Sequence, residues 1–280
     1  MRMPQVTQVA GMNLAYVFFP LSHFLDAMVE FEIESVELWG GVPHLYADDV
    51  SVADVARVRR EMERRDLTLA CYTPEQCSYP VNLAASGDHA RERSVRYFER
   101  SLEIAAELGA GLMLVTSGWG YRTEPQDEAW KRSRESLQRI ALRAGDLGVD
   151  LALEALQPTE SNLVIDMRSL GRMLAEIDST RVRVCLDTVS MAVAGDSIDE
   201  FFVTFGEALS HIHLNDGRPA GHLTWGDGSL PLVDYLEQIA RRDYRGHLTL
   251  EIADERYRLD PDDATRRGLA AVRRALAQSV

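Results

Sequence analysis

Short apolar segments alternate with longer amphipathic segments along the whole chain. Apolar runs of about four to eight residues are typical of buried strands, whereas apolar residues spaced three and four apart indicate helices. The expected strands are Gln8–Tyr16, Ser35–Leu38, Leu67–Tyr72, Gly111–Thr116, Val149–Glu154, Arg183–Asp187, Ser210–Leu214 and His247–Ile252. The expected helices are Leu21–Phe31, Val52–Arg65, His89–Leu108, Asp127–Leu147, Met167–Ile177, Ile198–Ala208, Pro231–Arg241 and Pro261–Ala277.

The ends of several expected helices carry residues that favour those positions. Ser51, Asp166 and Asp260 stand where a side-chain oxygen can accept the first free backbone N–H groups. Gly109 and Gly148 come just past the last residues of two long helices, where a left-handed backbone is common. These residues support the boundaries that the apolar pattern gives.

Eight strand and helix pairs in 280 residues predict a (β/α)₈ TIM barrel. A doubly wound sheet is the competing α/β fold, but no GxGxxG sequence follows the first strand. No Pro-, Gly- or Ser-rich linker divides the chain. We therefore expect residues 1–280 to form one barrel domain.

The charge of the chain narrows the choice of partners. The formal net charge of −14 gives little attraction for phosphate backbones or anionic lipids, so neither nucleic acid nor a membrane is expected as a partner. No apolar run approaches the roughly 20 residues that span a bilayer, and no signal peptide is evident. Three cysteines without metal-motif spacing fit a cytoplasmic protein better than a disulfide framework.

Polar residues at the expected strand ends are the candidates for chemistry, because catalytic groups of a barrel come from the carboxyl ends of its strands. They are Glu37, Glu75, Glu154, Asp187, His213 and Glu251. The last four follow four consecutive strands and should converge. Three carboxylates and one imidazole suit a divalent cation such as Mn²⁺, Co²⁺ or Mg²⁺ better than a structural zinc ion.

Each candidate also has a plain structural explanation, because a polar residue at a strand end is often a solvated side chain or a helix cap. His211 and His213 lie one residue apart on the same strand and share a face, so either could be the ligand. We choose His213, which is nearer the strand end. Glu154 and Glu251 are stronger candidates, because each closes an apolar run, LALE and LTLE.

Aromatic residues on the same face could enclose a sugar or could only pack loops together. They are Trp39, Tyr72, Tyr79, Trp119 and Trp225.

Four separated segments resemble the metal-binding segments of the xylose-isomerase-like barrel superfamily, in particular its sugar isomerase and epimerase branch. They are LALEALQPTESN, VCLDTVSM, HIHLND followed by HLTWGDG, and LTLEIAD. Two further stretches, VELWGGVPHLYADD and YTPEQCSYPVNL, are similar to those of fructoselysine 3-epimerases. The likeness to tagatose and psicose 3-epimerases is more distant.

The resemblance implies a metal-dependent isomerase that acts on carbohydrates and has a small sugar substrate. By similarity, the metal ligands are Glu154, Asp187, His213 and Glu251, with Mn²⁺ the favoured ion. Glu154 and Glu251 would also be the acid and base on opposite faces of the substrate. The resemblance also implies that Glu160 contacts the substrate. Further candidate substrate contacts, chosen for their places at strand ends or in loops of the same face, are Trp39, Tyr72, Glu75, Arg218 and His222. A homodimer or homotetramer is expected by resemblance only.

Two departures from tagatose and psicose 3-epimerases bear on the substrate. Those enzymes carry a histidine where this chain has Ser190 and an arginine where it has Pro219, with Arg218 just before it. Both missing groups hold substrate oxygens in those enzymes, so the departures favour a conjugated ketose over a free one. Glu154→Gln and Glu251→Gln are each expected to abolish turnover with little loss of stability.

Other functions use related parts. A lyase or dehydratase acting on a keto-sugar, keto-glycoside or inosose would share the deprotonation step and then eliminate a leaving group. DNA repair of the endonuclease IV kind needs a trinuclear metal site and a DNA-facing surface, which the charge of −14 disfavours. A non-catalytic sugar-binding module would leave the ligand set without a purpose.

Overall fold

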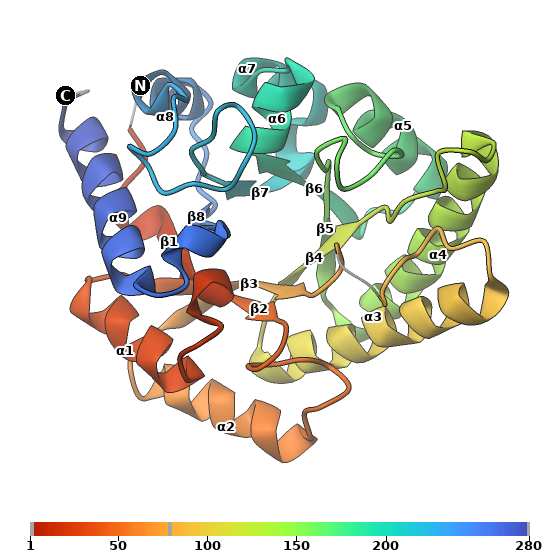
Figure 1. Cartoon of the computed structure of the whole chain (residues 1–280), viewed down its shortest axis with the longest axis horizontal. Helices are drawn as coiled ribbons and strands as arrows, with labels where there is room; N and C mark the ends of the chain where they lie inside the picture. Colours follow the sequence, from red (N-terminus) through yellow and green to blue (C-terminus); the bar gives the residue numbers. More distant parts are fainter. Residues whose placement is uncertain (1–2, 78–79, 279–280) are drawn as a thin grey trace.

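A computed structural model describes residues 3–77 and 80–278, and within them eight parallel strands close into a barrel in sequence order (Figure 1). The strands are β1 Val9–Met12, β2 Ser35–Gly40, β3 Thr68–Pro74, β4 Leu112–Thr116, β5 Asp150–Glu154, β6 Val182–Asp187, β7 Leu209–His213 and β8 Leu248–Leu250. Strand β8 pairs with β1 and completes the ring. The predicted (β/α)₈ barrel is confirmed, and the open doubly wound sheet is excluded.

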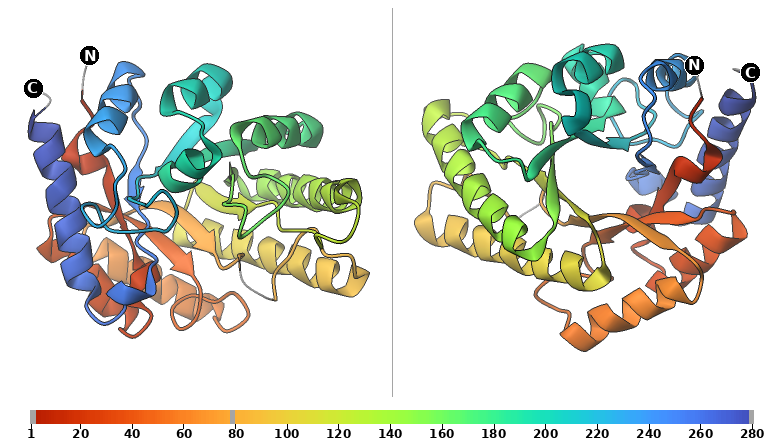
Figure 2. Two further views of the ribbon diagram at one scale, coloured as in Figure 1. Left: turned by 45° about the horizontal axis from the view of Figure 1, so that its top comes forward. Right: turned by 180° about the vertical axis from the view of Figure 1, so that it is seen from behind.

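Helices surround the strands on the outside, as both views in Figure 2 show. In the described residues they are α1 Leu21–Glu30, α2 Val52–Glu63, α3 Asp88–Leu108, α4 Gln126–Leu147, α5 Met167–Ile177, α6 Thr188–Ala194, α7 Ile198–Phe205, α8 Leu232–Arg241 and α9 Pro261–Gln278. Ser51 and Asp166 cap α2 and α5 as expected. Gly109 and Gly148 end α3 and α4 with φ of 83° and 70°.

The first strand is shorter than expected, because its pairing ends at Met12 and a 3₁₀ turn, Asn13–Tyr16, follows. There the side chain of Asn13 makes the hydrogen bonds to β2 that the strand backbone would otherwise make. Its Nδ2 donates to the carbonyl oxygen of Trp39 at 3.1 Å, and its Oδ1 accepts from the backbone N–H of Trp39 at 2.7 Å. An amide side chain that bonds to the neighbouring strand allows the chain to leave the barrel without losing a backbone partner.

Helix α6 was not expected from the sequence, because seven residues are too few to show a helical period. Asp187 starts the helix, since its Oδ1 accepts from the backbone N–H groups of Val189 at 2.9 Å and Ser190 at 2.6 Å. The strand-end carboxylate is therefore also a helix cap, which fixes its orientation.

The core has two parts, because successive side chains on a strand face opposite sides. A small cluster inside the barrel contains Cys71, Leu114, Ala152 and Cys185. A much larger cluster lies between the strands and the helices and includes Tyr72, the neighbour of Cys71. Cys71 is thus a packing residue, as the sequence indicated. No helix among the described residues is long and apolar enough to cross a membrane.

Candidate active site

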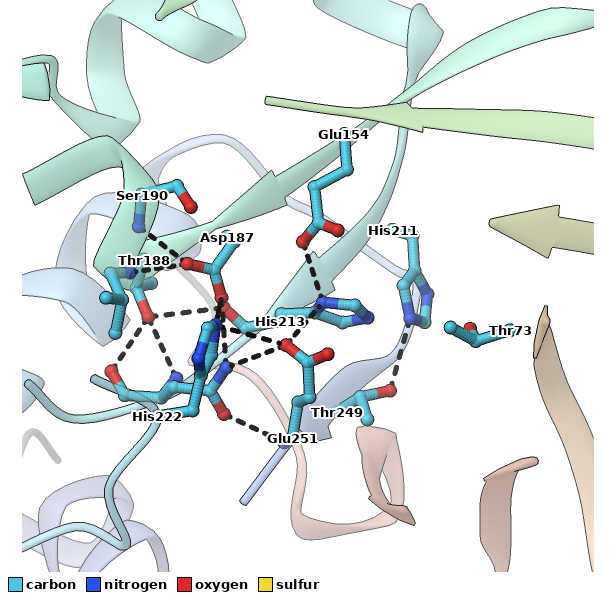
Figure 3. Close-up of polar contacts among 12 residues, drawn as sticks. Thr73, Glu154, Asp187, Thr188, Ser190, His211, His213, His222, Thr249 and Glu251 are labelled. Carbon is cyan, nitrogen blue, oxygen red and sulfur yellow. Dashed lines mark hydrogen bonds and ion pairs between the residues drawn. The ribbon is translucent and has the colours of Figure 1, made fainter. Parts of the chain in front are cut away.

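Four polar side chains converge at the carboxyl ends of the last four strands (Figure 3). Glu154, Asp187 and His213 are the last residues of β5, β6 and β7, and Glu251 directly follows β8. Each offers one ligand atom, and these atoms all lie within 4.8 Å of one another. The structure therefore brings together the four residues that the sequence put forward as metal ligands.

His213 lies at the centre of this group and is fully buried. Its Nδ1 is 2.9 Å from Oε1 of Glu154 and 3.1 Å from Oε2 of Glu251. Burial lowers the pKa of His213, but the surrounding acidic side chains, Cys185 and Glu251 first, raise that pKa well above its ordinary value. A proton on the ring can thus balance the carboxylates in the absence of a cation.

The two glutamates that meet His213 have opposite electrostatic properties. Burial raises the pKa of Glu154 from 4.5 to about 7, although His213 opposes the rise. Burial also favours the neutral form of Glu251, but His213 and His222 outweigh it and lower the pKa of that carboxyl. Near neutral pH one carboxyl is therefore partly protonated while its neighbour is ionised. Two carboxyls with pKa values pushed apart suit an acid and base pair.

Asn215 links the ligand carboxylates and was not identified from the sequence. Its Nδ2 is 2.9 Å from Oδ2 of Asp187 and 3.4 Å from Oε2 of Glu251, while its Oδ1 accepts from the backbone N–H of Glu251 at 2.8 Å. The available signal was its position two residues after His213. The amide orients two carboxylates without adding charge.

Glu37 and His211 lie deeper in the barrel than the four converging residues. Glu37, considered at first as a strand-end candidate, is fully buried and stands three residues before the end of β2. Its Oε2 is 2.7 Å from Nε2 of His211, and its Oε1 is 3.1 Å from Nε2 of His213. The hydroxyl of Thr73 also donates to Oε1. Of the two histidines, His213 is the one that contacts Glu154 and Glu251, so the geometry favours His213 as the candidate ligand.

A cavity of about 250 Å³ includes Glu154 and Glu251 in its wall. Other lining residues are Trp39, Glu75, Cys77, Glu160, His222 and Arg258. The indole N–H of Trp39 donates to Oε2 of Glu75 at 3.1 Å. Nε2 of His222 is 3.5 Å from Oε2 of Glu251. Four of the six expected substrate contacts, Trp39, Glu75, Glu160 and His222, thus border the same cavity as the two glutamates.

The other two expected substrate contacts, Tyr72 and Arg218, lie away from this cavity. Tyr72 is fully buried in the layer between strands and helices, and its hydroxyl donates to the carbonyl oxygen of Leu45 at 3.1 Å. Arg218 is exposed, and its Nε donates to the carbonyl oxygen of Asp227 at 2.8 Å. Neither side chain borders the cavity.

The remaining aromatic candidates divide between packing and a neighbouring cavity. Trp225 is buried, and its indole N–H donates to the carbonyl oxygen of Leu214 at 2.8 Å, so it packs a loop. Trp119 lines a second cavity of about 450 Å³. Tyr79 lies outside the described residues.

The donor set fits a divalent cation that prefers oxygen ligands. Glu154, Asp187 and Glu251 offer carboxylate oxygens and His213 offers Nδ1, all within 4.8 Å of one another. For Mn²⁺, Co²⁺ and Mg²⁺, a set of carboxylate and imidazole ligands is more suitable than a set of cysteine thiolates. Three carboxylates this close together repel one another when ionised, and a bound cation would compensate their charge.

Comparisons with known proteins agree with the fold. A model of the family described as xylose isomerase-like TIM barrel matches residues 25–275. Fructoselysine 3-epimerase of Escherichia coli O157:H7 is 28% identical over 235 residues, covering 83% of this chain and 86% of that protein. D-psicose 3-epimerase of Ruminiclostridium cellulolyticum is 32% identical over 122 residues, covering 44% of this chain and 41% of that protein.

Solved structures show the same architecture. The structure of D-psicose 3-epimerase with D-tagatose from Clostridium cellulolyticum H10 superposes with a TM-score of 0.78 at 20% identity. The superposition covers 96% of this chain and 99% of that chain. Together these findings confirm the relatives that the sequence motifs indicated.

Proposed function

Because the chain belongs to the xylose isomerase-like TIM barrel family, we propose that it is a divalent-metal-dependent sugar isomerase or epimerase. The reaction is proton transfer at the carbon next to the carbonyl of a ketose or ketose conjugate, with epimerisation at carbon 3 favoured. One observation carries this proposal: Glu154 and Glu251 line one cavity, have opposite pKa shifts and contact the same histidine, His213. The epimerases among its relatives support the same reaction class.

Glu154, Asp187, His213 and Glu251 are the residues that would hold the cation, with Mn²⁺ favoured over Co²⁺ and Mg²⁺. When bound, such an ion polarises a carbonyl and a neighbouring hydroxyl oxygen and so stabilises the enediolate charge. Asn215 holds Asp187 and Glu251 in place through its amide. The cap of α6 fixes the other oxygen of Asp187.

The two glutamates divide the proton transfer between them. Glu251, ionised near neutral pH, can take the proton from the substrate carbon. Glu154 borders the same cavity and, in its protonated form, can return a proton to that carbon from the opposite face. A general acid and a general base are most effective when their pKa values lie near the working pH. Return of the proton on the other face inverts the carbon.

A conjugated ketose is the favoured substrate because a second cavity shares lining residues with the cavity that the two glutamates border. Glu160 and Cys77 line both the 250 Å³ cavity and the second, 450 Å³ cavity. Trp119, Tyr121 and Arg122 line the second cavity. Two aromatic rings and a guanidinium provide contacts for a substituent that a free hexose does not possess. This agrees with the absence of the substrate-binding histidine at Ser190.

The proposal is tested by hydrogen exchange in deuterated water. With Mn²⁺ present, NMR should show loss of the carbon 3 proton and appearance of an epimer from at least one of fructose, psicose and fructoselysine. Glu154→Gln should stop both. Absence of exchange with every member of the panel would sink the proposal. Release of water or of an aglycone would instead identify a lyase.

A further inference from the structure

The carboxylate of Glu37 is fully buried, and among the described residues it is not one of those that line the 250 Å³ cavity. It is nevertheless hydrogen-bonded to His213, the histidine at the centre of the site. It comes from β2, and 176 residues of sequence separate it from His213. A buried charge persists only where paired groups compensate it. The contacts of Glu37 therefore bear on the state of His213.

Each oxygen of Glu37 has a histidine partner. Oε2 faces Nε2 of His211 at 2.7 Å, while Oε1 faces Nε2 of His213 at 3.1 Å and accepts from the Thr73 hydroxyl. The Thr73 hydroxyl and two imidazole nitrogens all lie within hydrogen-bond distance of the two oxygens, and such surroundings stabilise a carboxylate. An ionised carboxylate only accepts hydrogen bonds. Both Nε2 atoms must therefore carry a hydrogen.

This pairing determines which nitrogen of His213 is free. A neutral imidazole has one N–H and one lone pair, so a hydrogen on Nε2 leaves the lone pair on Nδ1. Nδ1 is the atom that lies 2.9 Å from Glu154 and 3.1 Å from Glu251. The lone pair is thus directed at the space where the ligand carboxylates meet.

We propose that Glu37 is a positioning residue that holds His213 with its Nδ1 lone pair toward a bound divalent cation. Carboxylates that accept from the far nitrogen of a metal-binding histidine fix its tautomer and raise its basicity. His211 braces the other oxygen of Glu37, and the rings of His211 and His213 meet edge to face at 5.2 Å. The inference rests on the proposed metal-dependent function.

The test measures Mn²⁺ binding by calorimetry on chelator-treated, full-length protein without substrate. Glu37→Gln keeps the size of the side chain, but its amide must offer N–H groups to one of the two histidines. Both histidines already donate there, so one contact is lost or the His213 tautomer is reversed. We expect Mn²⁺ affinity to fall by about 10- to 100-fold.

His211→Gln is the matched control, because it alters the same buried network on the side away from His213. Its amide can still donate to Glu37, so Mn²⁺ affinity should stay at the wild-type value even if thermal stability falls. Wild-type affinity in Glu37→Gln overturns the inference. An equal loss in both variants overturns it as well, since the effect would then come from packing.

A measurement on the wild-type protein covers the case in which Glu37→Gln does not fold. Proton–nitrogen NMR of histidine rings in the Mg²⁺-saturated protein should show His213 protonated on Nε2 only, with His211→Gln used for assignment. Protonation on Nδ1 overturns the inference. A wild-type protein that binds neither Mn²⁺ nor Mg²⁺ overturns the proposed function and this inference with it. Normal Mn²⁺ binding with unaltered Glu37→Gln affinity overturns the inference alone.

Discussion

Glu154→Gln should make the metal-free protein more stable at alkaline pH. The rise of the Glu154 pKa from 4.5 to about 7 means that the folded protein favours the neutral carboxyl. The stabilisation by this neutral group is complete below 4.5 and is lost as the pH rises through about 7. At 1.36 kcal/mol for each pH unit, the loss amounts to about 3 kcal/mol. The amide of the variant carries no charge at any of these pH values and suffers no such loss.

Glu251→Gln provides the opposite case. His213 and His222 lower the pKa of Glu251 in spite of its burial, so the folded protein favours the ionised carboxyl. That contribution is present above the ordinary pKa and is lost as the pH falls through the lowered one. Replacement should therefore destabilise the protein at neutral and alkaline pH. The sequence-based expectation was that both replacements cause little loss of stability; the pKa shifts keep that expectation for Glu154 and predict a loss for Glu251.

The assay is equilibrium urea unfolding of both variants and the wild type in the presence of a chelator. At about pH 4, Glu154→Gln should match the wild type, and at about pH 8 it should exceed it by up to about 3 kcal/mol. Glu251→Gln should fall below the wild type at about pH 8. If Glu154→Gln is also less stable than the wild type there, Glu154 is stabilised as an anion and the reasoning about its burial is wrong.

Four further predictions follow from the contacts around the site. Mn²⁺ affinity should fall between about pH 8 and about pH 6, because Glu154 and Nδ1 of His213 must lose their protons first; calorimetry showing no pH dependence would contradict this. Asn215→Ala should cost about 1 to 3 kcal/mol in urea unfolding, because two buried carboxylates lose an amide partner, and wild-type stability would count against that role. Arg218→Ala should keep the wild-type kcat/KM, since the guanidinium faces a loop carbonyl, whereas a large fall would return it to the substrate site. Tyr72→Phe should lose about 1 kcal/mol of stability with its hydrogen bond and retain activity, and a selective rise in KM would show that the hydroxyl reaches substrate.

The barrel could be predicted because its signals are local. Each apolar run is followed along the chain by an amphipathic helix, and Gly109 and Gly148 mark two of the helix ends. The ligand set followed from the fold, since the carboxyl ends of neighbouring strands meet at one face of a barrel. Glu154 and His213 could thus be placed together although 59 residues separate them.

Tyr72 was misplaced because a strand end cannot be read from apolar residues alone. The pattern ended the third strand at Tyr72, whereas pairing continues to Pro74. Tyr72 therefore lies below the rim, and the alternation of the strand turns its ring toward the helices. Arg218 was misplaced for a different reason. Asp216 accepts from the backbone N–H groups of Gly226 and Gly228 and folds the loop back on itself, a contact that spacing does not reveal.

Glu37 was a candidate from its strand position, but its contact with His213 could not be predicted, and Asn215 was not identified at all, because both roles depend on partners far away in the sequence. These partners also explain how the site can form before a cation arrives. The proton on His213, the amide of Asn215 and the first turn of α6 compensate the three ligand carboxylates from within the protein. A cation would then displace the proton between Glu154 and His213, while Glu37 keeps its own hydrogen bond to the far side of the ring. Unlike a structural zinc site, whose fold depends on its ion, this barrel has its ligands in position through its own hydrogen bonds, so removing the metal should abolish turnover and leave the fold intact.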